Sequence, residues 1–178
     1  MGGVKLIADS GATKTEWCLL KNGKKKIKTT QGISPYFFTE EKIIQLLQTE
    51  LWPSFPELAP TTEIHYYGTG MGSPVNVKML KKALKHVFGN ISIEISDDML
   101  AAARALNGRS KGLACNLGTG SFCCYYDGKK ITKKTPGIGY VLGDEGSGAY
   151  LGKKVIQYFM YKTFDEELNY KFEQKYNV

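Results

Sequence analysis

One order of segments occurs twice along this chain of 178 residues, and the repeat constrains the fold more than any other feature. Each copy begins with three strand-like segments, at 4–9, 15–21 and 26–30 in the first and at 112–117, 121–126 and 129–134 in the second. A glycine-containing turn joins the first two strands of each copy, and Asn22-Gly23 or Asp127-Gly128 predicts a hairpin turn before the third. The repeat therefore predicts two copies of one supersecondary plan.

Helices and strands alternate after the first three strands. We expect a helix at 39–51 that Pro53 and Pro56 end, a strand at 63–67, a helix at 74–88, a strand at 92–96 and a helix at 99–106. In the second copy, helices near 148–159 and 164–176 follow the strands. This order predicts an α/β protein of duplicated ribonuclease H-like domains, the plan of actin-like ATPases. The predicted domains are 1–110 and 111–178, the second of them incomplete.

Composition narrows the classes of partner. The formal net charge is +7, but the lysines form short runs beside predicted turns or on a polar helix face, which is typical of a solvated surface. We therefore expect no nucleic-acid partner. Since no apolar run approaches the roughly 20 residues that cross a bilayer, we expect no membrane association and a cytoplasmic protein. Cys18, Cys115, Cys123 and Cys124 match no zinc spacing and are expected to be buried thiols.

The first glycine turn has the composition of a phosphate-binding loop. Asp9 ends an apolar strand and is followed by the segment Ser10-Gly11-Ala12-Thr13-Lys14. A tight turn of this kind leaves backbone N–H groups directed outward, where they can hold phosphate oxygens. A carboxylate at the end of the strand is placed to hold Mg²⁺, through water. The alternative at this point is an ordinary turn.

The second copy repeats this loop. Its residues are Gly118, Thr119, Gly120 and Ser121, again between the first and second strands of the copy. Two such turns in register within a duplicated plan predict a pair of loops that grip nucleotide phosphates from two sides.

Asp98 is the candidate catalytic residue. It follows Asp97 where a predicted strand ends and a helix begins. Phosphoryl transfer needs a carboxylate that orients the attacking hydroxyl and accepts its proton. Aspartate also caps helices very often, so the pair supplies one residue for each role, and we assign the base to Asp98.

A glycine-rich segment at 136–148 precedes the helix at 148–159 and contains Asp144 and Glu145. Acidic residues at a helix start favour the helix dipole, which is the structural alternative. The functional alternative is that Asp144 accepts hydrogen bonds from sugar hydroxyls.

Taken together and in this order, four motifs resemble the N-acetylglucosamine kinase branch of the BadF/BadG/BcrA/BcrD-type ATPase family. They are Asp9-x-Gly-Ala-Thr-Lys-Thr, Asp98-x-x-Ala-Ala, Gly118-Thr-Gly-Ser and Gly143-Asp-Glu-Gly-Ser. The resemblance implies a kinase that uses ATP and Mg²⁺ to phosphorylate an amino sugar, a small-molecule partner. It implies that Gly11 to Lys14 and Gly118 to Ser121 hold phosphates, and that Asp98 is the base. It also implies that Gly137, Ile138, Gly139 and Asp144 line the sugar pocket.

Two positions depart from the pattern of that family. Ser34 stands before Pro35 where the family has a sugar-binding Asn, and Phe122 stands where an Asn follows the second phosphate loop. Both changes remove an amide that could hydrogen-bond the sugar, so the acceptor is less defined than the reaction.

Two alternative functions stay open. One is the activator ATPase of the same family, which holds an iron–sulfur cluster between subunits, and the other is a non-catalytic nucleotide- or sugar-binding sensor. A homodimer is the candidate assembly. We also expect the 178 residues alone to bind ATP weakly and to turn over no sugar, because the adenine pocket of this fold lies in the later part of the second domain.

Overall fold

The computed structural model describes residues 3–55 and 61–177. The chain divides into two compact units, Met1–Ala105 and Leu106–Val178, where we predicted domains at 1–110 and 111–178. Each unit is described by itself. Within the described residues, no helix is long and apolar enough to cross a membrane.

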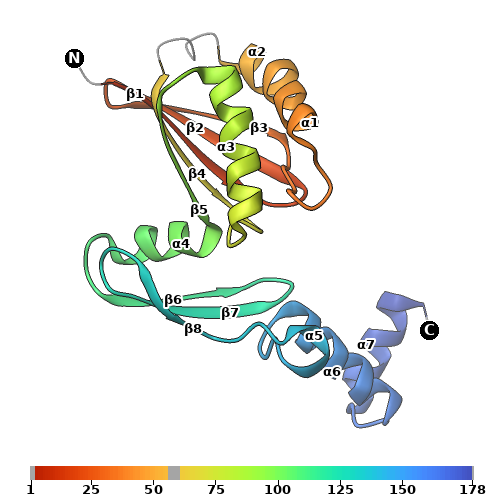
Figure 1. The fold of residues 1–178 in the computed structure, drawn as a ribbon. Coiled ribbons are helices and arrows are strands. Elements are labelled where there is room, and N and C mark those ends of the chain that lie inside the picture. Colours follow the sequence, from red (N-terminus) through yellow and green to blue (C-terminus); the bar gives the residue numbers. More distant parts are fainter. Residues whose placement is uncertain (1–2, 56–60, 178) are drawn as a thin grey trace. The chain divides into compact units, whose positions relative to one another are not determined.

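The first unit is built on a mixed sheet with the order β3-β2-β1-β4-β5 (Figure 1). Its strands are β1 Val4–Ser10, β2 Lys14–Lys21, β3 Lys24–Gln31, β4 Thr61–Gly68 and β5 Ser92–Asp97. Antiparallel pairing joins β1 to β2 and β2 to β3, whereas β1, β4 and β5 run parallel. The Asn22-Gly23 turn forms as predicted, with φ of 50° and 75°, and it leaves Lys21 paired with Lys24 in a two-residue hairpin.

Two helical segments pack on this sheet. The first starts at α1, Glu40–Leu46, where Thr39 accepts a hydrogen bond from Lys42 N. It continues through a π-helical turn, η1 Leu47–Leu51, into α2, Trp52–Ser54. The prediction that Pro53 ends this helix is wrong, because Pro53 lies in the first turn of α2, where no N–H is needed. Pro56 lies outside the described residues.

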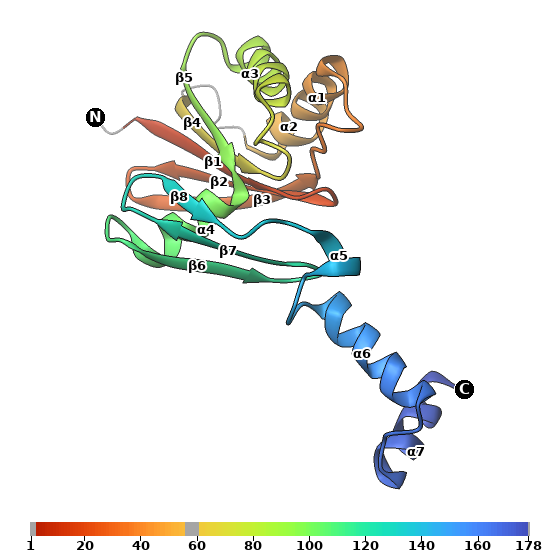
Figure 2. The ribbon, with the colours of Figure 1, turned by 60° about the horizontal axis from the view of Figure 1, so that its bottom comes forward.

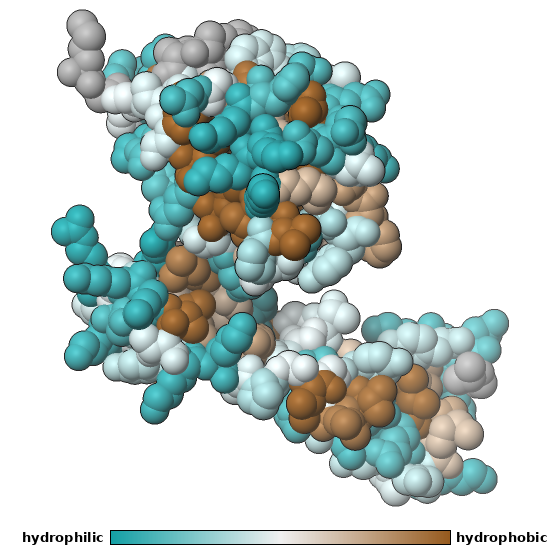
Figure 3. Space-filling model, in the orientation of Figure 1, coloured by the Kyte–Doolittle hydropathy of each residue, from teal (hydrophilic) through white to brown (hydrophobic). Residues whose placement is uncertain are grey.

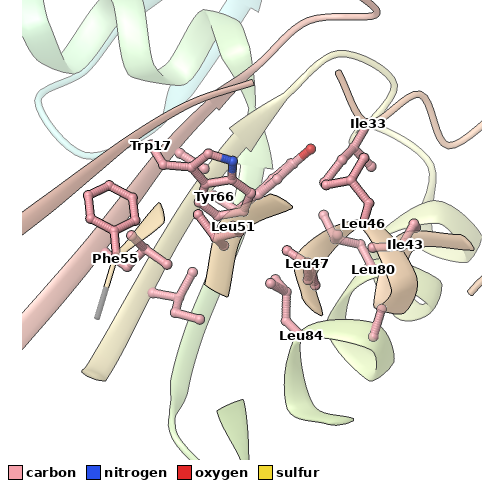
Figure 4. Close-up of a cluster of buried hydrophobic side chains, with 14 of the residues drawn as sticks. Trp17, Ile33, Ile43, Leu46, Leu47, Leu51, Phe55, Tyr66, Leu80 and Leu84 are labelled. Carbon is pink, nitrogen blue, oxygen red and sulfur yellow. The ribbon is translucent and has the colours of Figure 1, made fainter. Parts of the chain in front are cut away.

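The second is α3, Pro74–Phe88, which begins after Ser73 and ends at Gly89 as predicted. The core of the unit lies between these helices and one face of the sheet (Figure 4). Alternate strand residues and the apolar faces of the helices fill it, among them Trp17, Tyr66, Leu47, Leu80 and Leu84, all fully buried. The last helix, α4, Asp98–Asn107, begins directly at the end of β5.

The second unit opens with an antiparallel sheet in the order β6-β7-β8 (Figure 2). The strands are β6 Gly112–Leu117, β7 Ser121–Tyr126 and β8 Ile131–Lys134, and the helices are α5 Gly139–Leu142, α6 Gly148–Met160 and α7 Glu166–Tyr176. The third strand begins two residues later than predicted. The reason is Asp127, whose carboxylate accepts hydrogen bonds from Lys129 N and Lys130 N, both at 2.8 Å, and so holds these residues in a turn.

The prediction that all four cysteines are buried thiols is wrong. Cys124 is buried, but Cys18 is only half-buried, and Cys115 is exposed and forms a disulfide with Cys123. Strand alternation explains the difference: Cys124 faces the buried side of β7, and Cys123 faces the other.

The helices of the second unit bury none of their described residues completely. Apolar side chains gather on the surface in this region (Figure 3). They include Leu151, Val155, Ile156 and Met160 of α6.

Candidate functional site

The first glycine loop is a tight turn between β1 and β2. Gly11 N donates to Lys14 O at 3.0 Å, and the side chains of Gly11 to Lys14 are exposed. Gly32, just after β3, packs against the loop: Gly32 N donates to Thr13 O at 3.0 Å. A Cβ at Gly32 would lie 2.5 Å from the carbonyl oxygens of Gly11 and Ala12.

This contact sets the direction of the loop amides. The carbonyls of Gly11 and Ala12 face Gly32, and in a trans peptide the next N–H points the opposite way. The N–H groups of Ala12 and Thr13 are therefore directed away from the protein body. That is the arrangement with which a backbone turn binds an anion.

A pair of buried hydroxyls supports the loop from below. Ser10 Oγ and Thr15 Oγ1, the residues on either side of the turn, lie 2.7 Å apart and are both buried. Ile33 N donates to Ser10 Oγ at 3.4 Å, so the segment between β3 and Ser34 is attached to the same hydroxyl. Sequence reasoning missed this pair. Its only signal is two short hydroxyl residues at positions that face each other across a glycine turn.

Three carboxylates lie at the carboxyl ends of the parallel strands. Asp9 is the last residue but one of β1, Asp97 ends β5, and Asp98 starts α4. Parallel strands end at the same edge of a sheet, which is where open α/β sheets place their ligands. The first unit therefore places the predicted metal-binding residue, Asp9, at the same edge as the predicted base.

The neighbouring groups raise the pKa of Asp98. Its partial burial, a hydrogen bond with Asp97, and the negative charges of Asp97 and Asp9 raise the pKa of its carboxyl to about 6. Met99 N, at the start of α4, donates to Asp97 Oδ1 at 3.0 Å and to Asp98 Oδ1 at 2.9 Å. We predicted one residue as the helix cap and Asp98 as the base; in the structure both carboxylates accept a hydrogen bond from this amide.

A polar network holds α4 against the sheet. Arg104 Nη1 donates to Tyr67 Oη at 2.7 Å and to Glu94 Oε1 at 2.8 Å. Glu94 Oε2 in turn lies 2.9 Å from His65 Nδ1. Since Arg104 lies on the helix that begins at Asp98, these contacts fix the helix whose first residue is the candidate base.

The second glycine loop is bound to the start of α6. Gly118 N donates to Gly120 O at 2.9 Å within the loop, and Gly148 N donates to Gly118 O at 2.8 Å. Ala149 N donates to Thr119 O at 3.2 Å. The glycine-rich segment and the second loop, predicted separately, thus form one structure.

Asp144 lies against this second loop. Its Oδ1 accepts a hydrogen bond from Ser121 N at 3.3 Å, and a Cβ on Gly120 would lie 3.2 Å from both of its carboxylate oxygens. Its φ of 60° places it in the left-handed region, which aspartate adopts more readily than most residues other than glycine. The structure therefore places Asp144, the predicted sugar-binding residue, in contact with the predicted phosphate loop.

The other residues predicted to bind the sugar are divided between the two units. Gly137, Ile138 and Gly139 are exposed and precede or begin α5. Ser34 belongs to the first unit and is buried, and its carbonyl accepts hydrogen bonds from Phe37 N and Phe38 N. Sequence reasoning missed the aromatic residues next to it: Tyr36 is 70% exposed and Phe37 81% exposed.

Comparison with solved structures assigns the fold. The chain superimposes with a TM-score of 0.83 on a protein from Porphyromonas gingivalis that is provisionally named N-acetylglucosamine kinase, at 40% identity over 97% of this chain. A second protein with the same provisional name, from Chromobacterium violaceum, matches 89% of the chain with a TM-score of 0.63 and 21% identity. MreB5 of Spiroplasma citri, solved with ADP, matches 75% of this chain with a TM-score of 0.55 and 11% identity. The match spans 51% of the MreB5 chain.

The fold is thus that of the actin-like ATPases, as predicted. The chain spans 62% of the length of the Porphyromonas gingivalis protein and 57% of that of the Chromobacterium violaceum protein. No protein-family model matches the sequence, and no curated protein matches it.

Proposed function

We propose that this chain is the phosphate-binding and catalytic part of an ATP-dependent sugar kinase of the N-acetylglucosamine kinase-like branch of the BadF/BadG-type ATPases. The observation that carries the proposal is Asp98, which lies at the same edge of the sheet as Asp9 and the first glycine loop. Its raised pKa of about 6 suits a general base, since the group is then mostly ionised at neutral pH and still basic. The 40% identity to a provisionally named N-acetylglucosamine kinase supports the acceptor class.

Each residue has a role in this reaction. The outward N–H groups of Ala12 and Thr13 are the phosphate-binding groups of the first unit, and the loop Gly118 to Ser121 has the same role in the second unit. Asp98 orients the sugar hydroxyl and takes its proton as the oxygen attacks the terminal phosphorus, and ADP leaves as the bond from that phosphorus to the bridging oxygen breaks. Asp144 accepts hydrogen bonds from the sugar, and Gly137 to Gly139 of the same unit and Ser34 of the first unit are the other proposed sugar-binding residues.

Magnesium fits the residues present. Asp9 is exposed at the strand end next to the first loop, and carboxylate oxygens are the ligands that Mg²⁺ takes, usually with several waters retained. Bound with ATP, the ion would neutralise charge on the transferred phosphate.

The acceptor class is inferred from two carboxylates. Asp98 and Asp144 can both accept hydrogen bonds from sugar hydroxyls, whereas the departures at Ser34 and Phe122 remove two amides that could have bound the sugar. We therefore expect a hexose or amino-hexose phosphorylated on an exocyclic hydroxyl, with N-acetylglucosamine or glucosamine preferred.

The test separates binding from turnover. Calorimetry with ATP and Mg²⁺ on the 178-residue chain should detect weak binding, and a coupled assay on this chain should detect no sugar-dependent turnover. The same assay is then run on this chain joined to the part of the Porphyromonas gingivalis protein that the match leaves uncovered.

In that chimera we expect ADP release that depends on an amino-hexose and disappears with Asp98→Asn. Preference for a polyol, a carboxylic acid or a nucleoside would overturn the acceptor class. Nucleotide binding without turnover on any acceptor would favour a sensor. Stoichiometric iron after anaerobic purification would favour the activator ATPase.

A further inference from the structure

A disulfide lies at the base of the second glycine loop. Cys115 of β6 and Cys123 of β7 are direct partners across the antiparallel pair, and their sulfur atoms are bonded. Cys115 is exposed and Cys123 is partly exposed. Both therefore lie on a face of the sheet that small reagents in solution can reach.

The strand register brings the two side chains together without help from the bond. Cys123 N donates to Thr135 Oγ1 at 3.1 Å, and Cys123 O accepts from Thr135 N at 2.9 Å. The backbone groups of Cys123 therefore point away from β6, which makes Cys115 and Cys123 a non-hydrogen-bonded pair. In such pairs the side chains are closest, and the Cα–Cα distance of 4.1 Å agrees with this.

The bond encloses the whole of the second glycine loop. Cys115 and Cys123 are eight residues apart in sequence, and Gly118 to Ser121 lie between them. The loop carries the hydrogen bonds to Gly148 N and Ala149 N, so its shape also positions the start of α6. A covalent link two residue pairs below the loop therefore restricts how far the loop can open.

We propose that Cys115 and Cys123 are a reversible redox modification site whose oxidised form rigidifies the second glycine loop. The oxidant is a low-molecular-weight disulfide of the glutathione class. The exposed Cys115 thiolate attacks it and releases one small thiol, and the Cys123 thiolate then displaces the second small thiol from Cys115. Two cysteine thiols are oxidised, one small disulfide is reduced to two thiols, and the two protons pass to these leaving groups. This inference is independent of the proposed function.

The other two cysteines are the internal controls. Cys124 follows Cys123 directly but faces the buried side of β7, so it cannot reach Cys115. Cys18 lies in β2 of the other unit. Both remain thiols in the structure.

The experiment equilibrates the 178-residue chain in buffers of graded reduced and oxidised glutathione and then unfolds it in denaturant that contains the alkylating reagent, so that buried thiols also react. Peptide mass spectrometry then assigns the state of each cysteine. We expect Cys115 and Cys123 to lose their thiols together, with a linked peptide, while Cys18 and Cys124 are still alkylated. Full reduction should restore both thiols. Cys115→Ser should abolish the linked peptide, and Cys18→Ser should leave the titration unchanged.

Hydrogen exchange on the fully oxidised and fully reduced chain tests whether the disulfide rigidifies the second glycine loop. Amides of the peptide that spans Gly118 to Ser121 should exchange roughly tenfold more slowly when oxidised, because closing a short ring removes open states. In Cys115→Ser the two buffers should give the same exchange. Separate titration of the two thiols, mixed glutathione adducts as end products, or equal exchange in both states would overturn the proposal.

Discussion

Asp97 and Asp98 share one backbone amide, that of Met99, at the junction where β5 ends and α4 begins. Two carboxylates this close cannot both ionise at low cost, and the nearby charge of Asp9 adds to the repulsion. The consequence is a carboxyl at Asp98 whose pKa lies near 6. This relationship joins the stability of the first unit to its proposed chemistry.

Replacing Asp98 by Asn should remove catalysis while ATP binding stays. The amide keeps the size and hydrogen-bond reach of the carboxylate but cannot take a proton. We expect turnover of the chimera described above to fall by about 10²–10⁴-fold, the usual worth of a general base. Asp97→Asn is the matched control and should lower turnover far less. Near-normal turnover of the Asp98 variant would leave that residue a helix cap.

The same substitution should stabilise the fold at neutral pH. Because the folded-state pKa of Asp98 is raised above its unfolded value, its ionisation weakens folding as pH rises from about 4 to about 6. Removing the charge should raise the free energy of unfolding at pH 7 by about 1 kcal/mol, since solvent screening discounts the shift at this half-buried group. Urea denaturation at pH 4 and pH 7 measures this. An equal difference between wild type and variant at both pH values would contradict it.

Turnover should rise with pH over the range in which the stability of the fold falls. Asp98 must be ionised to accept a proton, so kcat should rise with pH and level off above about 6. A pH profile of the chimera under saturating substrates reads this directly. A kcat that is flat between pH 5 and 8 would exclude a titrating base with this pKa.

Gly32→Ala should damage the first glycine loop. The new Cβ would lie 2.5 Å from two backbone carbonyl oxygens, so the loop or β3 must shift. Overpacking of this kind costs about 1–3 kcal/mol, and we expect ATP affinity to fall with it. Gly72→Ala is the matched control, since its Cβ meets nothing within 4 Å. Calorimetry and thermal denaturation of both variants decide; equal behaviour would show that the contact does not shape the loop.

Arg104→Met should loosen α4. The substitution keeps the apolar stem but leaves Tyr67 and Glu94 without their shared donor. Because Arg104 and Glu94 are only partly buried, we expect a loss of about 1 kcal/mol in the free energy of unfolding. Lys171→Met removes an exposed ion pair with Glu167 on α7 and should cost less than about 0.5 kcal/mol. A larger loss in the free energy of unfolding from Lys171→Met than from Arg104→Met would contradict the expectation that the more exposed ion pair contributes less to stability.

Local sequence patterns determined the elements. The Asn22-Gly23 hairpin and the start of α3 after Ser73 follow from backbone preferences that act within four residues. The repeat of the three strands predicted the actin-like fold for the same reason, since each hairpin is specified by its own turn and alternation. The side chain of Asp127 holds Lys129 and Lys130 in the turn, so β8 begins two residues later than the sequence pattern predicted.

Tertiary structure alone decided the environments of the site residues. Asp98 is perturbed by Asp9, which is 89 residues away in sequence and reaches it only through parallel pairing. Gly32 acts on Gly11 and Ala12 because β2 and β3 fold back on β1, and Asp144 contacts Ser121 through a loop whose path no short pattern specifies. The register of β6 and β7 likewise pairs Cys115 with Cys123 rather than with its sequence neighbour Cys124. Sequence determines what each residue can do locally, whereas burial, charge and contact depend on residues that only the folded chain brings near.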